Sequence, residues 1–381
     1  MNIPTFKILE PGLLTTIQDM GRYGYQKYGV PVSGAMDQFA MRAANILVGN
    51  DENAAVLEIT ALGPKIEFIT DTYISITGAN LSTNLDNIPI PRWETIKTTR
   101  GSNLTFNEIQ DGMRAYLGIA GGIDVPLVLG SRSTNIQSSF GGLEGRSLKE
   151  GDIISTLIPI DAKLDFKNLP DTYLIPKYGE YHEIKIILNS QENIFALEAS
   201  QIITQSKYII SPESDRMGYK LEGPKLLHQN GPDIISEGNP PGAIQVSGDG
   251  QPTILLADRG TTGGYTKIAT VISTDMSKLA QALPGQALTF KSVTREEANK
   301  SFYEQEKILE MMRSKDVLDV NLYQGQTISV DGRVFEIQDG TRNLTEVSTS
   351  TVNTDSKQKY SAKATVNNTT HNFEIEIGRK S

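Results

Sequence analysis

The fold is decided by the stretch Asp111-Gly112-Met113-Arg114-Ala115-Tyr116-Leu117-Gly118-Ile119-Ala120-Gly121-Gly122. Its middle, Arg114–Ile119, alternates along a short run and predicts a β-strand that ends at paired glycines. A similar unit recurs further on, where Asp249-Gly250 precedes the strand Thr253–Ala257 and Thr262-Gly263-Gly264 follows it. Two such units predict related β domains in tandem. Chance similarity between β-hairpins is the rival explanation.

The remaining sequence also favours strands over helices. Tyr73–Thr77 and Glu183–Leu188 alternate in the same way, and each is flanked by Gly, Asp, Asn or Pro. The chain holds 34 glycines and 17 prolines, which favour many short strands joined by turns. The sequence therefore predicts a mainly β protein, of the barrel or sandwich kind, with few helices.

Three segments have the spacing and the end signals of short helices: Met36–Val48, Asp275–Leu283 and Arg295–Met312. Ser33 is the expected N-cap of the first and Thr274 that of the second. Thr294 and Glu297 form a capping-box pattern before the third.

We expect three regions along the chain, an N-terminal unit over 1–182, a second unit over 183–313 and a small β appendage over 314–381. The last region is polar and rich in Thr, Ser and Asn. Its expected strands are Val317–Val320, Thr327–Val330, Val334–Ile337, Lys363–Val366 and Asn372–Ile377.

Composition narrows the functional classes. The 381 residues carry a formal net charge of −9, so binding to nucleic acid by neutralising phosphates is not expected. The absence of cysteine excludes disulfides and thiolate chemistry, and it is consistent with a reducing cytoplasm. Neither a signal-peptide core nor an apolar run of roughly 20 residues occurs, so we expect a cytoplasmic protein without a membrane contact.

Familiar catalytic signatures do not occur in the chain. It lacks the phosphate loop G-x-x-x-x-G-K-[ST], a Rossmann G-x-G-x-x-G after a strand, and a G-x-S-x-G elbow. The three histidines, His182, His228 and His371, have no spacing typical of a metal site, so no metal is expected. Chemistry here would use carboxylates, Arg, Lys, amides, hydroxyls and backbone N–H groups, or a cofactor carried by another protein.

Two polar loops in the first half are candidate binding segments. Arg22 precedes the first predicted helix and Asp37 lies in its first turn, where free N–H groups could face an anion. Arg132 lies in the turn Ser131–Thr134, which has the composition of an anion-binding loop. The alternative for each loop is a structural role, with Arg22 and Asp37 as an ion pair and Arg132 on an exposed turn.

The densest polar cluster lies in the second half. Arg216 and Arg259 are candidate anion or carbonyl binders, and Glu237 and Asp258 are candidate bases or arginine partners. We take Arg216, Glu237 and Asp258 as the catalytic candidates. The residues expected to bind substrate in this cluster are Gln245, Gln251, Thr262 and Lys267. The alternative is a set of buried salt bridges that lock loops onto a barrel.

These motifs, in this order, resemble one known family. The matching strings are Gly12–Arg22, Gly29–Pro31, Ser33–Asp37, Leu57–Thr60, Ala120–Pro126, Leu129–Thr134, Ser214–Tyr219, Ser236–Gly238, Gly242–Val246 and Asp258–Ile272. The chain is identified by them, over roughly residues 5–300, as a member of the biotin-dependent carboxyltransferase, or allophanate hydrolase subunit 2, family. The family includes KipA proteins and the C subunits of 5-oxoprolinases. The resemblance implies two tandem cyclophilin-like β-barrel units, without implying prolyl isomerase activity.

The resemblance also implies partners. It suggests a subunit of an ATP-dependent 5-oxoprolinase-type complex, which acts on a lactam carbonyl with a KipI-like, or allophanate hydrolase subunit 1-like, protein and a lactam hydrolase subunit. One alternative is a KipA-type regulator that binds a KipI-like kinase inhibitor. Another is a carboxyltransferase component that moves a carboxyl group from carboxybiotin to a urea-like acceptor. ATP would be used by the complex, and the partner protein is one candidate for the subunit that binds it. Biotin would need a separate carrier, because the chain has no Met-Lys-Met attachment sequence.

Overall fold

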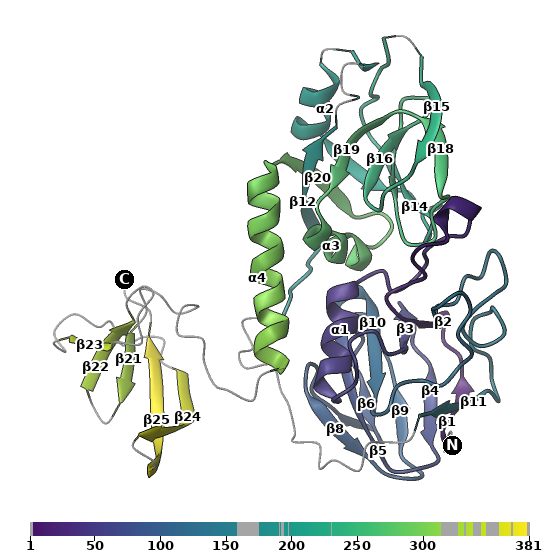
Figure 1. Ribbon diagram of the computed structural model, residues 1–381. Coiled ribbons are helices and arrows are strands. Elements are labelled where there is room, and N and C mark those ends of the chain that lie inside the picture. Colours follow the sequence, from purple (N-terminus) through teal and green to yellow (C-terminus); the bar gives the residue numbers. More distant parts are fainter. Residues whose placement is uncertain are drawn as a thin grey trace. The chain divides into compact units, whose positions relative to one another are not determined.

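The computed structural model describes residues 3–157, 175–189, 191, 194–196, 198–229 and 231–313, together with the backbone of five strands between 327 and 378. The chain divides into two compact units, Met1–Arg313 and Ser314–Ser381. Figure 1 shows the strands and helices of both units. The prediction of a mainly β fold with few helices is confirmed.

The N-terminal half of the first unit consists of two sheets around one core. One sheet runs in the order β11 (Ile153–Thr156), β1 (Ile3–Glu10), β4 (Lys65–Phe68), β9 (Asn103–Thr105), β6 (Asn84–Leu85) and β7 (Ile88–Pro89). The other runs β2 (Leu14–Gln18), β3 (Val56–Thr60), β10 (Asp111–Ile119), β5 (Thr72–Asn80) and β8 (Thr95–Thr98). Buried side chains from both sheets, such as Phe6 and Leu117, form a single cluster. Burying this apolar surface is the main stabilising term for the two-sheet arrangement.

The second half is a closed barrel of seven strands. Its order is β12 (Tyr181–Leu188), β19 (Lys267–Val271), β16 (Ala243–Val246), β17 (Pro252–Leu255), β14 (Gly218–Glu222), β13 (Lys207–Ile210) and β20 (Ala287–Ser292). The parallel pair β12–β20 closes it, and closure removes exposed sheet edges. β15 (Asp233–Gly238) and β18 (Thr262–Tyr265) form a separate two-stranded sheet. The repeated strands of the sequence fall in β10 and β17, so one copy lies in an open sheet and the other in the barrel.

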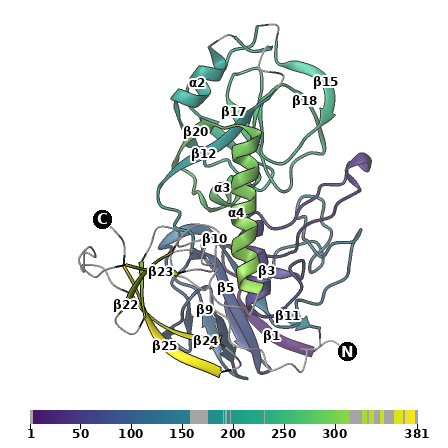
Figure 2. The same cartoon turned by 60° about the vertical axis from the view of Figure 1, so that its left-hand side comes forward.

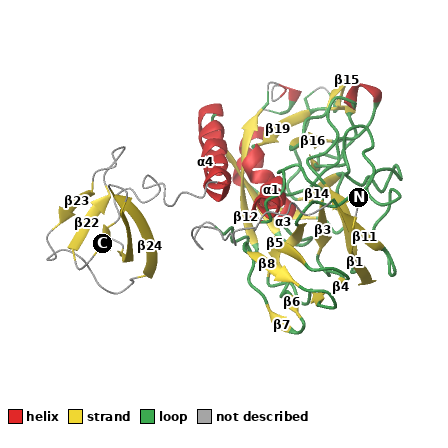
Figure 3. Ribbon diagram, turned by 60° about the horizontal axis from the view of Figure 1, so that its bottom comes forward, coloured by secondary structure: helices red, strands yellow, loops and turns green. Residues whose placement is uncertain are grey.

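The α-helices of this unit are α1 (Gln38–Leu47), α2 (Ala199–Gln205), α3 (Met276–Gln281) and α4 (Arg295–Arg313), with 3-10 turns at η1 (Gln26–Tyr28) and η4 (Ser273–Asp275). In the described part of the chain, no helix is long and apolar enough to cross a membrane. Figure 3 shows α1, α3 and α4 gathered beside the strands. The three predicted helices therefore form, with small shifts at their ends.

The expected N-caps are wrong for the first two helices. Asp37, and not Ser33, caps α1, because its Oδ1 accepts a hydrogen bond from Ala40 N over 3.0 Å. Ser33 has a left-handed φ of 57° and accepts from Asn135 instead. α3 follows Asp275 without any side-chain cap, so Thr274 does not cap it.

α4 begins with the predicted capping box and runs past α3 (Figure 2) toward α1 (Figure 1). Thr294 N donates to Glu297 Oε2 over 2.8 Å, and Glu297 N donates back to Thr294 Oγ1 over 3.2 Å. Near its other end, Leu309 and Met312 are buried in one cluster with the α1 side chains. α4 therefore connects the two halves by packing against both.

The second unit holds one sheet of five strands, in the order β23 (Leu344–Val347), β22 (Arg333–Ile337), β21 (Thr327–Val330), β25 (Thr369–Gly378) and β24 (Gln358–Val366). The β character expected of this region is present there. The predicted strand Val317–Val320 lies outside the described residues.

Candidate functional site

Arg216 and Asp258, two of the three catalytic candidates, form an ion pair beside two neighbouring barrel strands. β14 and β17 are antiparallel, with Gly218 opposite Leu255. The residues just outside these strands therefore meet, and Asp258 N donates to Arg216 O over 2.9 Å. The side chains pair as well, because Arg216 Nε donates to Asp258 Oδ2 over 2.8 Å.

Glu58, on β3 of the N-terminal half, completes this ion pair. Arg216 Nη1 donates to Glu58 Oε1, and Arg216 Nη2 donates to the carbonyl of Gly34 over 2.7 Å. Burial lowers the pKa of the Arg216 guanidinium, but the charges of Glu58 and Asp258 outweigh burial and raise that pKa overall. Two buried carboxylates thus balance the charge of Arg216. The arrangement favours a role in joining the two halves over a role in binding a ligand.

Asp37 belongs to the same buried polar network. Tyr116 Oη accepts a hydrogen bond from Asp37 N over 2.7 Å and donates to Glu58 Oε2 over 2.8 Å. Gln281, at the end of α3, donates to Asp37 Oδ2 over 2.9 Å. Burial raises the pKa of the Asp37 carboxyl, which is fully enclosed. Asp37 therefore connects α1, β10 and α3.

Arg22 and Arg132 lie around the buried carboxylate of Asp19. Arg132 N donates to Asp19 Oδ2 over 2.5 Å. Arg22 Nη2 donates to Ser133 O over 2.5 Å, and its guanidinium lies 4.5 Å from the centre of the Phe140 ring. Burial lowers the pKa of Arg22, with the charge of Asp19 acting against it. These contacts hold two loops together, but among the described residues Arg22 forms no ion pair with Asp37, and Arg132 is half-buried.

Three other polar candidates of the second half, Gln251, Thr262 and Gln245, have different surroundings. Gln251 makes two hydrogen bonds with the backbone of Gly223, through Nε2 over 3.1 Å and through Oε1 over 3.2 Å. Thr262 is exposed at the start of β18. Gln245 on β16 lies against Gly263, where a Cβ would be only 2.8 Å from Gln245 Nε2. Glycine at 263 is what lets this amide lie beneath β18.

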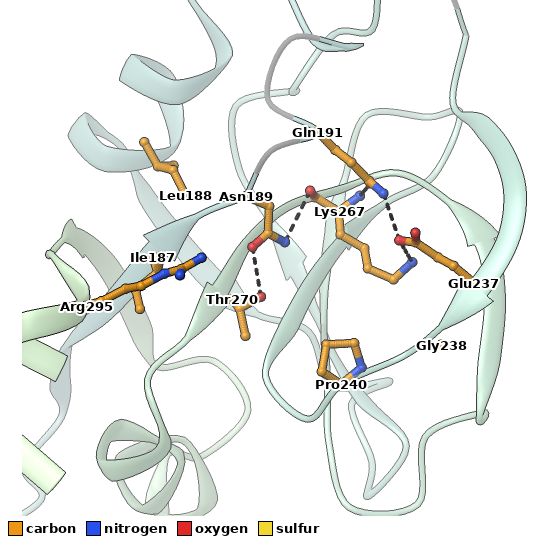
Figure 4. Close-up of a pocket in the computed structure, with 10 residues that line it drawn as sticks. All are labelled: Ile187, Leu188, Asn189, Gln191, Glu237, Gly238, Pro240, Lys267, Thr270 and Arg295. Carbon is orange, nitrogen blue, oxygen red and sulfur yellow. Dashed lines mark hydrogen bonds and ion pairs between the residues drawn. The ribbon is translucent and has the colours of Figure 1, made fainter. Parts of the chain in front are cut away.

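Glu237 and Lys267 meet in a cavity of about 410 Å³ beside the barrel (Figure 4). Lys267 Nζ lies 2.9 Å from Glu237 Oε1. Gln191 contacts both partners, since its Nε2 donates to Glu237 Oε1 over 2.7 Å and its Oε1 accepts from Lys267 N over 2.8 Å. The other polar side chains of the lining are Asn189, Thr270 and Arg295. In the described residues, no hydrogen bond or ion pair links this cluster to Arg216.

The cavity combines a buried cation with an accessible anion. The Lys267 side chain is 3 % exposed, whereas that of Glu237 is 45 % exposed. The hydrogen bond from Lys267 lowers the pKa of Glu237, against a smaller opposing effect of burial, so the carboxylate stays ionised. A held ammonium can stabilise an oxygen that gains negative charge. A neighbouring carboxylate can move a proton.

A metal ion has no evident ligand set. Among the described residues there is no group of three or more His, Cys, Asp or Glu side chains that could hold one. The polar groups that line the cavity are Lys267, Glu237, Arg295, Thr270 and the surrounding amides.

Comparison with known proteins identifies the family. Residues 28–292 match the family described as the carboxyltransferase domain, subdomains A and B. The chain belongs to this family. The resemblance found in the sequence motifs is thereby confirmed for this carboxyltransferase-domain protein.

Two kinds of relatives share the carboxyltransferase domain. The 5-oxoprolinase C subunit of Escherichia coli K12 is 38 % identical over 306 residues, which are 80 % of this chain and 97 % of that protein. Its counterpart in Haemophilus influenzae is 34 % identical with the same coverage. The urea amidolyase of Saccharomyces cerevisiae is 35 % identical over 309 residues, but only 17 % of its length is covered.

A solved structure supports the same fold. The urea carboxylase of Kluyveromyces lactis superimposes with a TM-score of 0.77 at 29 % identity, over 89 % of this chain and 33 % of that one. The carboxyltransferase domain is therefore a separate subunit in one kind of relative and part of a much longer chain in the other.

Several residues of these two clusters are not among the candidate site residues of the sequence, although Glu58 lies in the matching string Leu57–Thr60. Glu58 is a carboxylate within the apolar strand Val56–Thr60, and a charge in such a strand is a signal that could have identified it. Gln191 and Asn189 lie in a polar run after β12, and only the folded structure shows them beside Lys267.

Proposed function

We propose that this protein is the C-type subunit of an ATP-dependent 5-oxoprolinase complex, acting with a KipI-like subunit and a lactam hydrolase subunit. The observation that carries the proposal is the extent of the match. The chain covers 97 % of the Escherichia coli 5-oxoprolinase C subunit but only 17–24 % of the urea amidolyases and the related urea carboxylase. Nearly the whole of that C subunit is therefore represented in this chain, and the 38 % identity to it is higher than the 31–35 % identity to the urea enzymes.

The cavity of Glu237 and Lys267 is the proposed site for the lactam. Lys267 would donate a hydrogen bond to the carbonyl oxygen, where negative charge develops during attack at the carbonyl carbon. Glu237 forms an ion pair with Lys267, and its exposed face can accept or return a proton. Gln191, which already contacts both side chains, would orient the lactam N–H and C=O groups. Arg216 and Asp258 would not contact the lactam. Their role would be indirect, because they fix the barrel against the N-terminal half.

The residues present do not fit a triphosphate in this cavity. The lining carries two cations, Lys267 and Arg295, and Lys267 is already paired with Glu237. A carboxylate at that position would repel phosphate oxygens. We therefore propose that ATP binds to a partner subunit, and we assign it no role in this cavity.

The second candidate function is carboxyl transfer from carboxybiotin to a urea-like acceptor. The superposition on the urea carboxylase of Kluyveromyces lactis favours it. Urea and a lactam share a planar C=O flanked by N–H, so the same ammonium and amides could receive either. Biotin would come from a separate carrier.

Reconstitution tests the proposal. The full chain is mixed with the KipI-like and lactam hydrolase subunits of its own genome, and ATP-dependent glutamate release from 5-oxoproline is measured. A parallel sample receives urea and carboxybiotin, and consumption of carboxybiotin is followed. Glutamate release that needs this chain supports the proposal. Stable binding of the KipI-like subunit without either activity would favour a KipA-type regulator instead.

A further inference from the structure

A second cavity, of about 520 Å³, lies between α1, α4 and the barrel. Much of its wall is apolar, from Met36 and Phe39 on one side to Met276 and Phe302 on the other. Pro240 lines both this cavity and the one that holds Lys267, so the two are neighbours. This volume suits a small organic molecule.

Arg259 gives this cavity a positive charge. It follows Asp258 in the loop after β17 and is only 6 % exposed. Its Nε donates to Asn239 O over 2.8 Å, and its Nη1 donates to Leu256 O over 3.1 Å. Among the described residues, no carboxylate lies within ion-pair distance of Arg259, and none accepts a hydrogen bond from Nη2. Two backbone carbonyls thus fix the guanidinium without neutralising it.

The other charges near Arg259 are already balanced. Arg42 lines the cavity and is paired with Glu306, which lines it too, and with Glu52. Asp258 is engaged by Arg216. Burial lowers the pKa of Arg259, with Tyr23 and Asp258 acting against it. A buried cation without a counter-ion is costly, and an anionic ligand would remove that cost.

We propose that this cavity binds a small monocarboxylate, with the carboxylate on Arg259 and the apolar body against Phe39 and Phe302. A planar guanidinium recognises a carboxylate through charge-assisted hydrogen bonds. The largely apolar wall excludes highly charged ligands such as nucleotides. This site goes beyond the function proposed above. 5-Oxoproline also carries a carboxylate. Its binding in the Arg259 cavity is the only part of this inference that rests on the proposed 5-oxoprolinase function.

Binding to the full chain tests the site with three probes of similar size. Cyclopentanecarboxylate has the carboxylate without the lactam, pyrrolidin-2-one has the lactam without the carboxylate, and 5-oxoproline has both. Calorimetry gives the affinity. The fluorescence of Trp93, the single tryptophan, reports on this cavity because its ring lies 5.8 Å from that of Phe39. We expect both carboxylates to bind and to change the Trp93 emission, and pyrrolidin-2-one to leave it unchanged.

Arg259→Gln should weaken cyclopentanecarboxylate roughly 10- to 100-fold, as expected for the loss of a charge-assisted hydrogen bond. Phe302→Glu places a negative charge at the cavity wall and leaves in place the two backbone carbonyls that hold Arg259. It should also weaken the binding of cyclopentanecarboxylate. Tyr303→Glu is the matched control, because Tyr303 is exposed on the same helix and does not line the cavity.

Unchanged affinity in both Arg259→Gln and Phe302→Glu would overturn the inference, as would pyrrolidin-2-one binding here as tightly as cyclopentanecarboxylate. If cyclopentanecarboxylate binds and 5-oxoproline does not, the carboxylate site stands. That result would show only that the Arg259 cavity does not take 5-oxoproline. The lactam site at Lys267 is tested separately by glutamate release, so the two proposals can fail separately.

Discussion

The guanidinium of Arg216, beside barrel strand β14, is ion-paired with the carboxylate of Glu58 on β3 of the N-terminal half. Both side chains are buried, and Asp258 holds the other edge of the same guanidinium. The barrel and the two sheets are thus joined by a charged contact as well as by apolar packing. This contact fixes the orientation of the barrel that carries the candidate site.

Glu58→Gln should destabilise the protein strongly. The substitution keeps the size of the side chain but removes one of the two negative charges around Arg216. Breaking a buried ion pair by removing one partner typically costs about 3–5 kcal/mol, because the remaining charge stays buried. Chemical denaturation measures the change in the free energy of unfolding. Glu213→Gln is the control, because Glu213 pairs with Lys220 on the surface, and we expect no measurable change there. Equal effects of the two substitutions would contradict a joining role for Glu58.

Asp152 should contribute a pH-dependent part of the stability. Burial acts to raise its pKa, but hydrogen bonds from Arg146 and from Lys149 N hold the pKa below its ordinary value. A lowered pKa in the folded state stabilises the protein above the unfolded pKa of about 3.9, and this stabilisation is lost as the pH falls through the folded pKa. The gap in unfolding free energy between wild type and Asp152→Asn should therefore narrow from about pH 6 to about pH 3. A gap that is constant across this range would contradict the assignment.

Arg42 should hold the C-terminal half of α4. Its guanidinium pairs with Glu306 on α4 and with Glu52, which Arg313 also contacts. In Arg42→Met we expect the amides of α4 to exchange with solvent roughly 5- to 30-fold faster, which corresponds to about 1–2 kcal/mol, while β10 stays protected. Hydrogen exchange followed by mass spectrometry separates the two segments. Lys300→Met, which removes an exposed contact with Glu304, should leave α4 unchanged.

A chain that ends at Arg313 should keep the fold of the first unit. Residues Met1–Arg313 form one compact unit by themselves. The truncated chain should show a single cooperative thermal transition and the same affinity as the full chain for the KipI-like subunit that we propose as its partner. A truncated chain that aggregates or loses the partner would show that residues 314–381 take part in the assembly.

The sequence predicted the elements better than their assembly. Alternation and turn residues placed β10, β12 and β17 correctly, because these signals are local. The cap of α1 was assigned to the wrong residue, since Ser33 and Asp37 are both good N-caps and only the backbone path before the helix decides between them. The closed barrel and the two open sheets depend on pairing between strands that are far apart in the sequence. A short stretch of sequence does not predict such pairing.

The candidate site also depends on contacts between distant segments, which local sequence patterns do not reveal. Arg216 and Asp258 were expected to act together, and they meet because they flank neighbouring strands. Their third partner, Glu58, comes from the other half of the unit, so no spacing could reveal it. Glu237 was grouped with Arg216 by proximity in the sequence, whereas the structure pairs it with Lys267. The cluster of polar residues in the sequence therefore predicts the region of the candidate site, but not which side chains share a cavity.

Lys267 is the residue on which the proposed function depends most directly. The decisive measurement is ATP-dependent glutamate release from 5-oxoproline by the reconstituted complex, with the wild-type chain and with Lys267→Met, after circular dichroism has shown that both are folded. Lys220→Met, which removes an exposed lysine of the same barrel, is the control. We expect activity with the wild type and the control, and a rate roughly 10²- to 10³-fold lower with Lys267→Met. A wild-type rate in the Lys267→Met complex would contradict the assignment of this cavity as the site of reaction.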